Sequence, residues 1–302
     1  MGVLDSIGNT PLVKLESLNK NRQVTVLAKL EGNNPGGSVK DRIALAMVRD
    51  AERTGQLKQG DTILEATSGN TGIGLAMVGA ALGYRVILTM PECVSLERRK
   101  VLEAFGAELI LSPGCEGTDG AIKVCRRMHA NHPGKYFMPN QFDNPANVRA
   151  HYDTTGPEII EQTGGRLNVF VAGMGTTGTL MGAGRRLREF DPKIRIVGVE
   201  PNLGHKIQGL KNMKESIVPK NYDPSFADEK ITVADDAAFT TTRELALKEG
   251  LFVGMSSGAA VWGALEMAKR LKEGTVVVIL PDRGDRYLST SLFTSVCAKC
   301  PP

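Results

Sequence analysis

The chain has 302 residues, of which 41% are hydrophobic and 23% are charged, a composition typical of a globular protein with a sizeable core. Its 37 basic and 33 acidic residues leave a formal net charge of +4, which is too small an excess to favour a nucleic-acid partner. No apolar stretch approaches the ~18 residues of a membrane span, so we expect no membrane association.

The length predicts about two domains. The cysteines number five, a low and odd count that favours the reducing cytoplasm. The terminal pair Cys297 and Cys300 lacks the second ligand pair of a zinc site, and the four histidines have no recognisable ligand spacing. We therefore expect no metal.

Short apolar and β-branched runs alternate with longer helical patterns along the chain. The expected strands are 62–66, 85–90, 107–111, 168–172, 194–199 and 275–280, and the expected helices lie near 71–82, 95–105, 118–130, 179–190 and 257–272. This alternation predicts an α/β fold with parallel sheets and right-handed crossovers. The stretch 140–157 is rich in Asn, Pro, Thr and Gly and is expected to cross between two sheets.

The first unusual segment is Asn33-Asn-Pro-Gly-Gly-Ser-Val-Lys-Asp-Arg42. Pro-Gly-Gly predicts a turn, and Ser38 with Asp41 resembles the capping box of a helix. Lys40 then falls in the first helical turn, where the positive end of the helix dipole lowers the pKa of an ammonium group. Such a lysine can supply the neutral amine of a Schiff base, but an ordinary surface lysine fits the segment equally well.

Two loops each connect an expected strand to an expected helix. Thr67-Ser-Gly-Asn-Thr-Gly72 follows strand 62–66, and Gly173-Met-Gly-Thr-Thr-Gly178 follows strand 168–172. A loop that ends at a helix N-terminus can bind an anion. Ordinary turns between a strand and a helix remain the alternative for both loops.

The second loop has the G-x-G-x-x-G pattern of a dinucleotide site, and Glu200 is spaced for a ribose contact. However, the hydroxyls of Thr176, Thr177 and Thr179 are better suited to a terminal phosphate. Two anion loops and an activated lysine together indicate an amino acid joined to pyridoxal 5′-phosphate (PLP).

Several motifs carry a resemblance that covers nearly the whole chain. They are Ile7-Gly-Asn-Thr-Pro-Leu12, Ser38–Arg42, Thr67–Gly72, Thr154-Thr-Gly-Pro-Glu158, Gly175–Thr179, Ser256-Ser-Gly258 and Arg286-Tyr-Leu-Ser-Thr290. With them the chain resembles the cysteine synthase family, which comprises fold-type II PLP enzymes that act as O-acetylserine or O-phosphoserine sulfhydrylases. Thr177, Glu97-Arg-Arg99 and Asp282-Arg-Gly-Asp-Arg286 resemble the B-type branch.

The resemblance implies an α/β fold of the tryptophan synthase β-like kind, with two three-layer domains and mainly parallel, twisted sheets. Residues 36–145 would form a smaller, mobile domain that carries the substrate-carboxylate loop. Residues 1–35 and 146–302 would form a larger domain that carries the sites for the PLP phosphate and pyridine ring. A homodimer is also implied.

The resemblance assigns a role to each candidate residue. Lys40 would form the Schiff base with PLP and act as the base at Cα, and Asn70 would bind the ring hydroxyl. The cofactor phosphate would be held by Gly175, Thr176, Thr177, Gly178 and Thr179, and the substrate carboxylate by Thr67, Ser68, Gly69 and Thr71 with Gln141 nearby. Ser256 would face the pyridine nitrogen, which makes PLP a weaker electron sink than a carboxylate partner would.

The implied reaction is β-replacement of an activated serine by sulfide, through an aminoacrylate, to give L-cysteine. O-acetylserine is the default donor, and Lys211 stands where a cationic side chain would meet the phosphate of O-phosphoserine. Pro281 puts thiosulfate as the sulfur source in doubt. The alternatives are an enzyme like cystathionine β-synthase and, more distantly, an NAD-dependent oxidoreductase.

Overall fold

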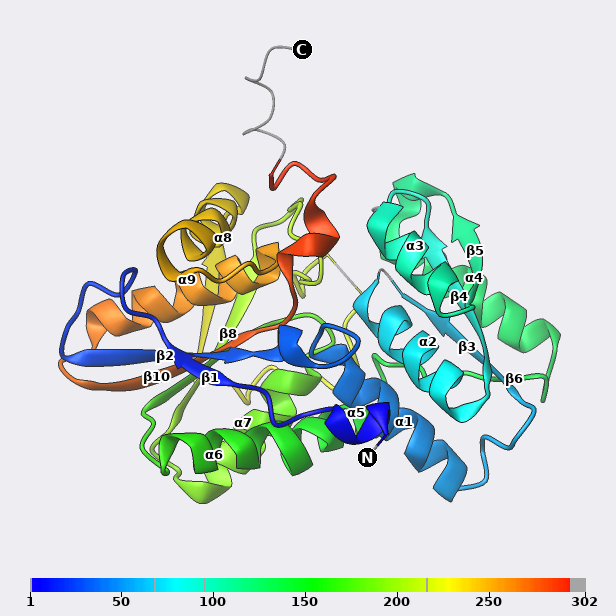
Figure 1. Cartoon of the computed structure of the whole chain (residues 1–302), viewed down its shortest axis with the longest axis horizontal. Helices are drawn as coiled ribbons and strands as arrows, with labels where there is room; N and C mark the ends of the chain where they lie inside the picture. Colours follow the sequence, from blue (N-terminus) through cyan, green and yellow to red (C-terminus); the bar gives the residue numbers. More distant parts are fainter. Residues whose placement is uncertain (1, 68, 95, 216, 294–302) are drawn as a thin grey trace, which may run out of the picture.

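Two sheets lie side by side in the computed structural model, which describes residues 2–67, 69–94, 96–215 and 217–293 (Figure 1). The larger sheet contains, in spatial order, β1 (Leu12–Lys14), β2 (Val24–Leu30), β10 (Gly274–Leu280), β7 (Val169–Gly173), β8 (Arg195–Pro201) and β9 (Glu229–Val233). Strand β1 is antiparallel to β2, and the other pairs are parallel. The predicted α/β fold with mainly parallel sheets is confirmed.

The larger sheet is covered on both faces, so its central strands β7 and β10 consist mainly of apolar residues. In β7, Val169 and Val171 pack towards α8 (Asp235–Glu249) and α9 (Met255–Arg270). Phe170 and Ala172 point to the opposite face, towards α7 (Gly178–Phe190). The alternation of side chains along a strand therefore produces three layers.

The smaller sheet has the order β5 (Glu108–Ser112), β4 (Arg85–Pro91), β3 (Thr62–Ala66) and β6 (Tyr136–Phe137), and all its pairs are parallel. Its helices are α1 (Lys40–Arg53), α2 (Asn70–Leu82), α3 (Leu96–Ala104) and α4 (Gly117–Asn131). Ile63 of β3 packs with residues of α1 and α2, whereas Leu64 packs with residues of α4. This sheet is also sandwiched between helices.

The expected crossing at 140–157 does connect the two sheets, but it is largely helical. It contains α5 (Pro145–Ala150), a π-helical turn at His151–Thr155 and the start of α6 (Gly156–Thr163). Asn144 caps α5 by accepting a hydrogen bond from Ala146 N at 2.9 Å, with Pro145 in the first turn. The Asn and Pro residues therefore mark a helix start, as capping preferences allow.

No helix in the described part of the chain is long and apolar enough to cross a bilayer. Within the same residues, no group of three His, Cys, Asp or Glu side chains comes together as a metal site. Cys297 and Cys300 lie outside the described residues.

Candidate active site

Lys40 is the first residue of α1 and follows a tight turn. Lys40 N donates to Ser38 Oγ at 3.2 Å, and Gly36 N donates to Asp41 Oδ2 at 2.7 Å. These contacts differ from the expected capping box of Ser38 and Asp41, because the Asp41 carboxylate accepts from Gly36 N in the preceding turn. The turn fixes where the helix begins and thus where Lys40 points.

The side chain of Lys40 faces a cavity of about 690 Å³. Burial lowers the pKa of its amine, and the charges of Asp282 and Glu31 oppose this by raising it. The direction agrees with the expectation from the sequence, and burial is its largest cause. The amine therefore loses its proton more readily than an exposed lysine does.

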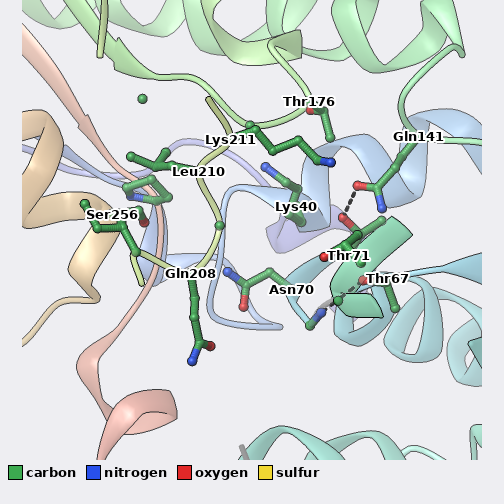
Figure 2. Close-up of a pocket in the computed structure, with 18 of the residues that line it drawn as sticks. Lys40, Thr67, Asn70, Thr71, Gln141, Thr176, Gln208, Leu210, Lys211 and Ser256 are labelled. Atoms are coloured by element: carbon green, nitrogen blue, oxygen red, sulfur yellow. Dashed lines mark hydrogen bonds between the residues drawn. The ribbon is translucent and has the colours of Figure 1, made fainter. Parts of the chain in front are cut away.

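The cavity lies at the carboxyl ends of strands from both sheets, where α/β proteins commonly bind ligands. Figure 2 shows that Lys40, Asn70, Thr71, Gln141, Thr176, Lys211 and Ser256 surround it from different elements. Thr67, Gly69, Gly175, Thr177 and Thr179 complete the set of candidate residues that line it. Gly178 begins α7 directly behind this lining, and Ser68 lies outside the described residues.

The loop at residues 67–72 is held by its own hydroxyl groups. Gly69 N and Gly72 N donate to Thr67 Oγ1 at 3.1 and 3.2 Å. Thr71 donates to Gln141 Oε1 at 2.6 Å (Figure 2). Gln141 Nε2 donates to Ala66 O at 3.1 Å. Among the described residues no acceptor takes the Thr67 proton or the second amide proton of Gln141, so both are available to an anion in the cavity.

Asn70 is fixed by residues from the segment after β10. Its Nδ2 donates to Asp282 Oδ2 at 2.6 Å, and Arg286 Nη1 donates to its Oδ1 at 2.5 Å. Tyr287 donates to the same oxygen of Asp282 at 2.6 Å. One N–H of the Asn70 amide is left over. The sequence placed Asp282, Arg286 and Tyr287 within motifs but indicated no role for them in the site.

Residues 175–179, the threonine loop, form a cradle at the start of α7. A Cβ at Gly175 would lie 2.5 Å from Gly209 O, so only glycine fits there without a shift. Thr177 has a φ of 63°, a left-handed conformation that turns the chain into the helix. Thr176 and Thr179 line the cavity at the N-terminus of α7, where unpaired N–H groups favour an oxyanion, whereas the Thr177 hydroxyl donates to Thr176 O at 2.7 Å.

Ser256 and Lys211 are two further candidates that line the cavity. Ser256 is 4% exposed and lies in the first turn of α9. Lys211 Nζ lies 3.6 Å from Asp119 Oδ1 and 5.0 Å from the centre of the Phe142 ring. Burial lowers the pKa of Lys211, and Asp119 opposes that shift. Lys211 is thus a partly screened cation inside the cavity.

This arrangement suits PLP on three grounds: a buried lysine amine that faces the cavity, a glycine and threonine loop at a helix N-terminus, and the Asn70 amide, which two side chains hold in place. Fold and site together define a PLP-dependent enzyme with two mainly parallel sheets. The family model for pyridoxal-phosphate dependent enzymes matches residues 3–282, and the chain belongs to that family.

The chain is similar over nearly its full length to several cysteine synthases. It is 49% identical to a cysteine synthase of Aquifex aeolicus over 300 residues, which cover 97% of this chain and 92% of that protein. It is 50% identical to cysteine synthase B of Escherichia coli, with 95% of this chain and 94% of that protein covered. A crystal structure of cysteine synthase from Entamoeba histolytica superimposes with a TM-score of 0.92 at 40% identity, covering 97% of this chain and 90% of the other.

Proposed function

We propose that this chain is a PLP-dependent transferase that makes L-cysteine from an activated L-serine and sulfide. The observation that carries the proposal is one cavity lined by Lys40, by the 67–72 loop and by the threonine loop. A lysine between two anion sites suits an amino acid whose carboxylate binds in one loop while the cofactor phosphate binds in the other.

Lys40 is proposed to move the proton at Cα. When bound, PLP withdraws electrons from the substrate Cα and acidifies its C–H bond. The lowered pKa of Lys40 favours the neutral amine, which accepts this proton while the leaving group departs from Cβ. After sulfide has bonded to Cβ, the Lys40 ammonium returns the proton to Cα.

The 67–72 loop is proposed to bind the substrate carboxylate. Thr67 supplies a hydroxyl proton, because its oxygen already accepts from two loop N–H groups. Gln141 supplies an amide proton, because Thr71 and Ala66 O hold the rest of its amide. The first-turn N–H groups of α2 add the positive end of a helix dipole.

The threonine loop is proposed to hold the cofactor phosphate, and Ser256 and Asn70 the ring. The Ser256 hydroxyl is a neutral partner for the pyridine nitrogen and cannot keep it protonated as a carboxylate would. Electron withdrawal is then moderate, which favours loss of a leaving group from Cβ over transamination.

The donor is proposed to be O-acetylserine, with O-phosphoserine as the second possibility. Lys211 supports the second donor, because its ammonium lies inside the cavity. Asp119 opposes it, because its carboxylate lies 3.6 Å from that ammonium and would repel a phosphate.

We also propose the remaining features that follow from family membership. Residues 36–145 would move as a smaller domain over the cavity and exclude water when the carboxylate binds. The enzyme would be a homodimer in the cytoplasm, without nucleic-acid or membrane partners.

The direct test is an assay of purified enzyme with O-acetylserine and each of three sulfur acceptors: sulfide, thiosulfate and homocysteine. We expect cysteine formation with sulfide to have the highest kcat/KM. Faster formation of cystathionine from homocysteine would replace this proposal by the cystathionine β-synthase-like alternative. No product with any acceptor would contradict β-replacement.

A further inference from the structure

The threonine loop is backed by a helical segment that the sequence did not connect with it. Helix α5 and the π-helical turn after it pack closely on the start of α7. Two glycines permit this: a Cβ at Gly178 would lie 1.8 Å from Asn147 Oδ1, and one at Gly182 would lie 2.1 Å from Val148 O. Single π-helical turns occur frequently at functional sites. The contact brings two buried polar side chains onto the threonines.

The first of these side chains is Asn147, which is 0% exposed. Its Nδ2 donates to Gln141 O at 2.7 Å and to Thr176 Oγ1 at 3.1 Å. The Gln141 carbonyl fixes the orientation of this amide, because a flipped amide would set two oxygens against each other. Thr176 Oγ1 therefore accepts a hydrogen bond from Asn147, and its hydroxyl proton can be donated to a ligand in the cavity.

The second side chain is His151, which is 1% exposed and touches two hydroxyls. Its Nδ1 lies 2.9 Å from Thr155 Oγ1, and its Nε2 lies 3.1 Å from Thr179 Oγ1. Burial, with the charge of Arg42 as the next cause, lowers the pKa of His151 to about 3. The ring is therefore neutral at physiological pH, and one nitrogen donates while the other accepts.

We propose that His151 is a positioning residue whose Nε2–H donates to Thr179 Oγ1, so that the Thr179 proton points at the cofactor phosphate. The inference rests on the proposed phosphate-binding role of the threonine loop. With the proton on Nδ1 instead, Nε2 would accept a hydrogen bond from the Thr179 hydroxyl, and the lone pairs of that hydroxyl would face the phosphate oxygens. Asn147 Nδ2 likewise donates to Thr176 Oγ1, so the hydroxyls of both Thr176 and Thr179 can donate to the phosphate.

The test uses two variants of His151 and measures the Kd of the apoenzyme for PLP. His151→Gln places an amide N–H near the position of Nε2, whereas His151→Leu fills the space without a donor. We expect His151→Leu to raise Kd by about 10- to 100-fold, as loss of a hydrogen bond to a charged group does, and His151→Gln by less than about threefold. The same Kd rise in both variants would overturn the inference.

Thr179→Val separates positioning from general structural support. In the Thr179→Val background, His151→Leu is expected to raise Kd no further, because the effect passes through the Thr179 hydroxyl. A full additional rise would overturn the inference about His151. If Thr179→Val itself leaves Kd unchanged, the phosphate-binding role of Thr179 fails, and with it the premise taken from the proposed function.

A second measurement reads the tautomer in the unaltered holoenzyme. Histidine labelled with ¹⁵N distinguishes the protonated from the unprotonated ring nitrogen, and the His151→Gln spectrum assigns the signal. We expect the proton of His151 on Nε2. A proton on Nδ1 would overturn the inference, even if His151→Leu failed to fold.

Discussion

Arg42 of α1 and Glu158 of α6 form a two-point ion pair, with Nη1 2.6 Å from Oε1 and Nη2 2.8 Å from Oε2. Arg42 Nε also donates to Glu31 Oε2 at 2.7 Å. The Arg42 side chain is 1% exposed and stands two residues beyond Lys40. These ion pairs therefore anchor α1, which carries Lys40, to α6 and to the segment that contains Glu31.

Arg42→Met should destabilise the protein strongly, because it leaves the buried Glu31 carboxylate without its ion-pair partner and leaves Glu158 paired with Lys29 alone. We expect a loss of about 3–5 kcal/mol in the free energy of unfolding, measured by urea denaturation. Arg49→Met is the matched control on the same helix, because Arg49 is 54% exposed and pairs with Glu52. Its loss should stay below about 1 kcal/mol. Equal losses in the two variants would contradict the structural role of the buried network.

Asp282→Ala should lower turnover while the cofactor stays bound. Without this carboxylate the Asn70 amide loses the acceptor that orients it, whereas the threonine loop is unchanged. We expect kcat to fall by about tenfold or more, roughly the effect of one misplaced hydrogen bond. Asp282→Asn retains an oxygen acceptor and should recover most of that loss. The exposed Asp285 supplies the control, and an equal effect of Asp285→Ala would refute the argument.

Glu65→Gln should change how stability depends on pH. Burial raises the pKa of Glu65 to about 8 from the ordinary 4.5, against the opposing backbone N–H groups of Asn140, Gln141 and Ala66. Between these pH values the folded state binds a proton that the unfolded state releases, so Glu65 makes stability fall as pH rises. Glu65→Gln lacks this pH-dependent contribution to the free energy of unfolding.

Urea denaturation at pH 5, 6.5 and 8 measures the difference between Glu65→Gln and the unaltered protein. We expect the variant to gain relative stability steadily towards pH 8. Asp41, whose pKa burial raises to about 7, contributes the same slope to both proteins and cancels. Parallel stability curves would show that Glu65 titrates normally.

Lys211→Ala should affect the two donors unequally. We expect kcat/KM for O-phosphoserine to fall at least about tenfold relative to that for O-acetylserine, because only O-phosphoserine carries a phosphate that attracts the Lys211 ammonium. Asp119→Asn should shift the ratio the other way by removing the competing carboxylate. Equal loss with both donors after Lys211→Ala would rule out a phosphate-reading role.

The core strands and the cavity loops were predictable because each has a local signal. Strand β3 occurs at the expected residues 62–66, where an apolar run ends in a hydroxyl- and glycine-rich turn. In parallel sheets such turns gather at one edge, so the two loops and Lys40 meet around one cavity.

Other elements were missed because their signals depend on distant residues. Strand β2 contains Lys29, whose side chain is 0% exposed and pairs with Glu158 at 2.6 Å, so a core position looks polar in the sequence. Helix α8 contains the run Thr240–Thr242, which has low helix propensity and is stabilised by packing on α9. Asn147 and His151 reach the threonine loop only through the close approach of two helices.

Borohydride reduction of the holoenzyme, followed by proteolysis and peptide mass spectrometry, tests the central claim most directly, because it makes the bond between PLP and its lysine permanent. In the part of the chain that the structure describes, three lysines line the cavity, namely Lys40, Lys206 and Lys211. We expect the pyridoxyl mass on the peptide that contains Lys40, and its absence together with loss of turnover in Lys40→Ala. The label on Lys206 or Lys211, or an active Lys40→Ala enzyme, would contradict the account.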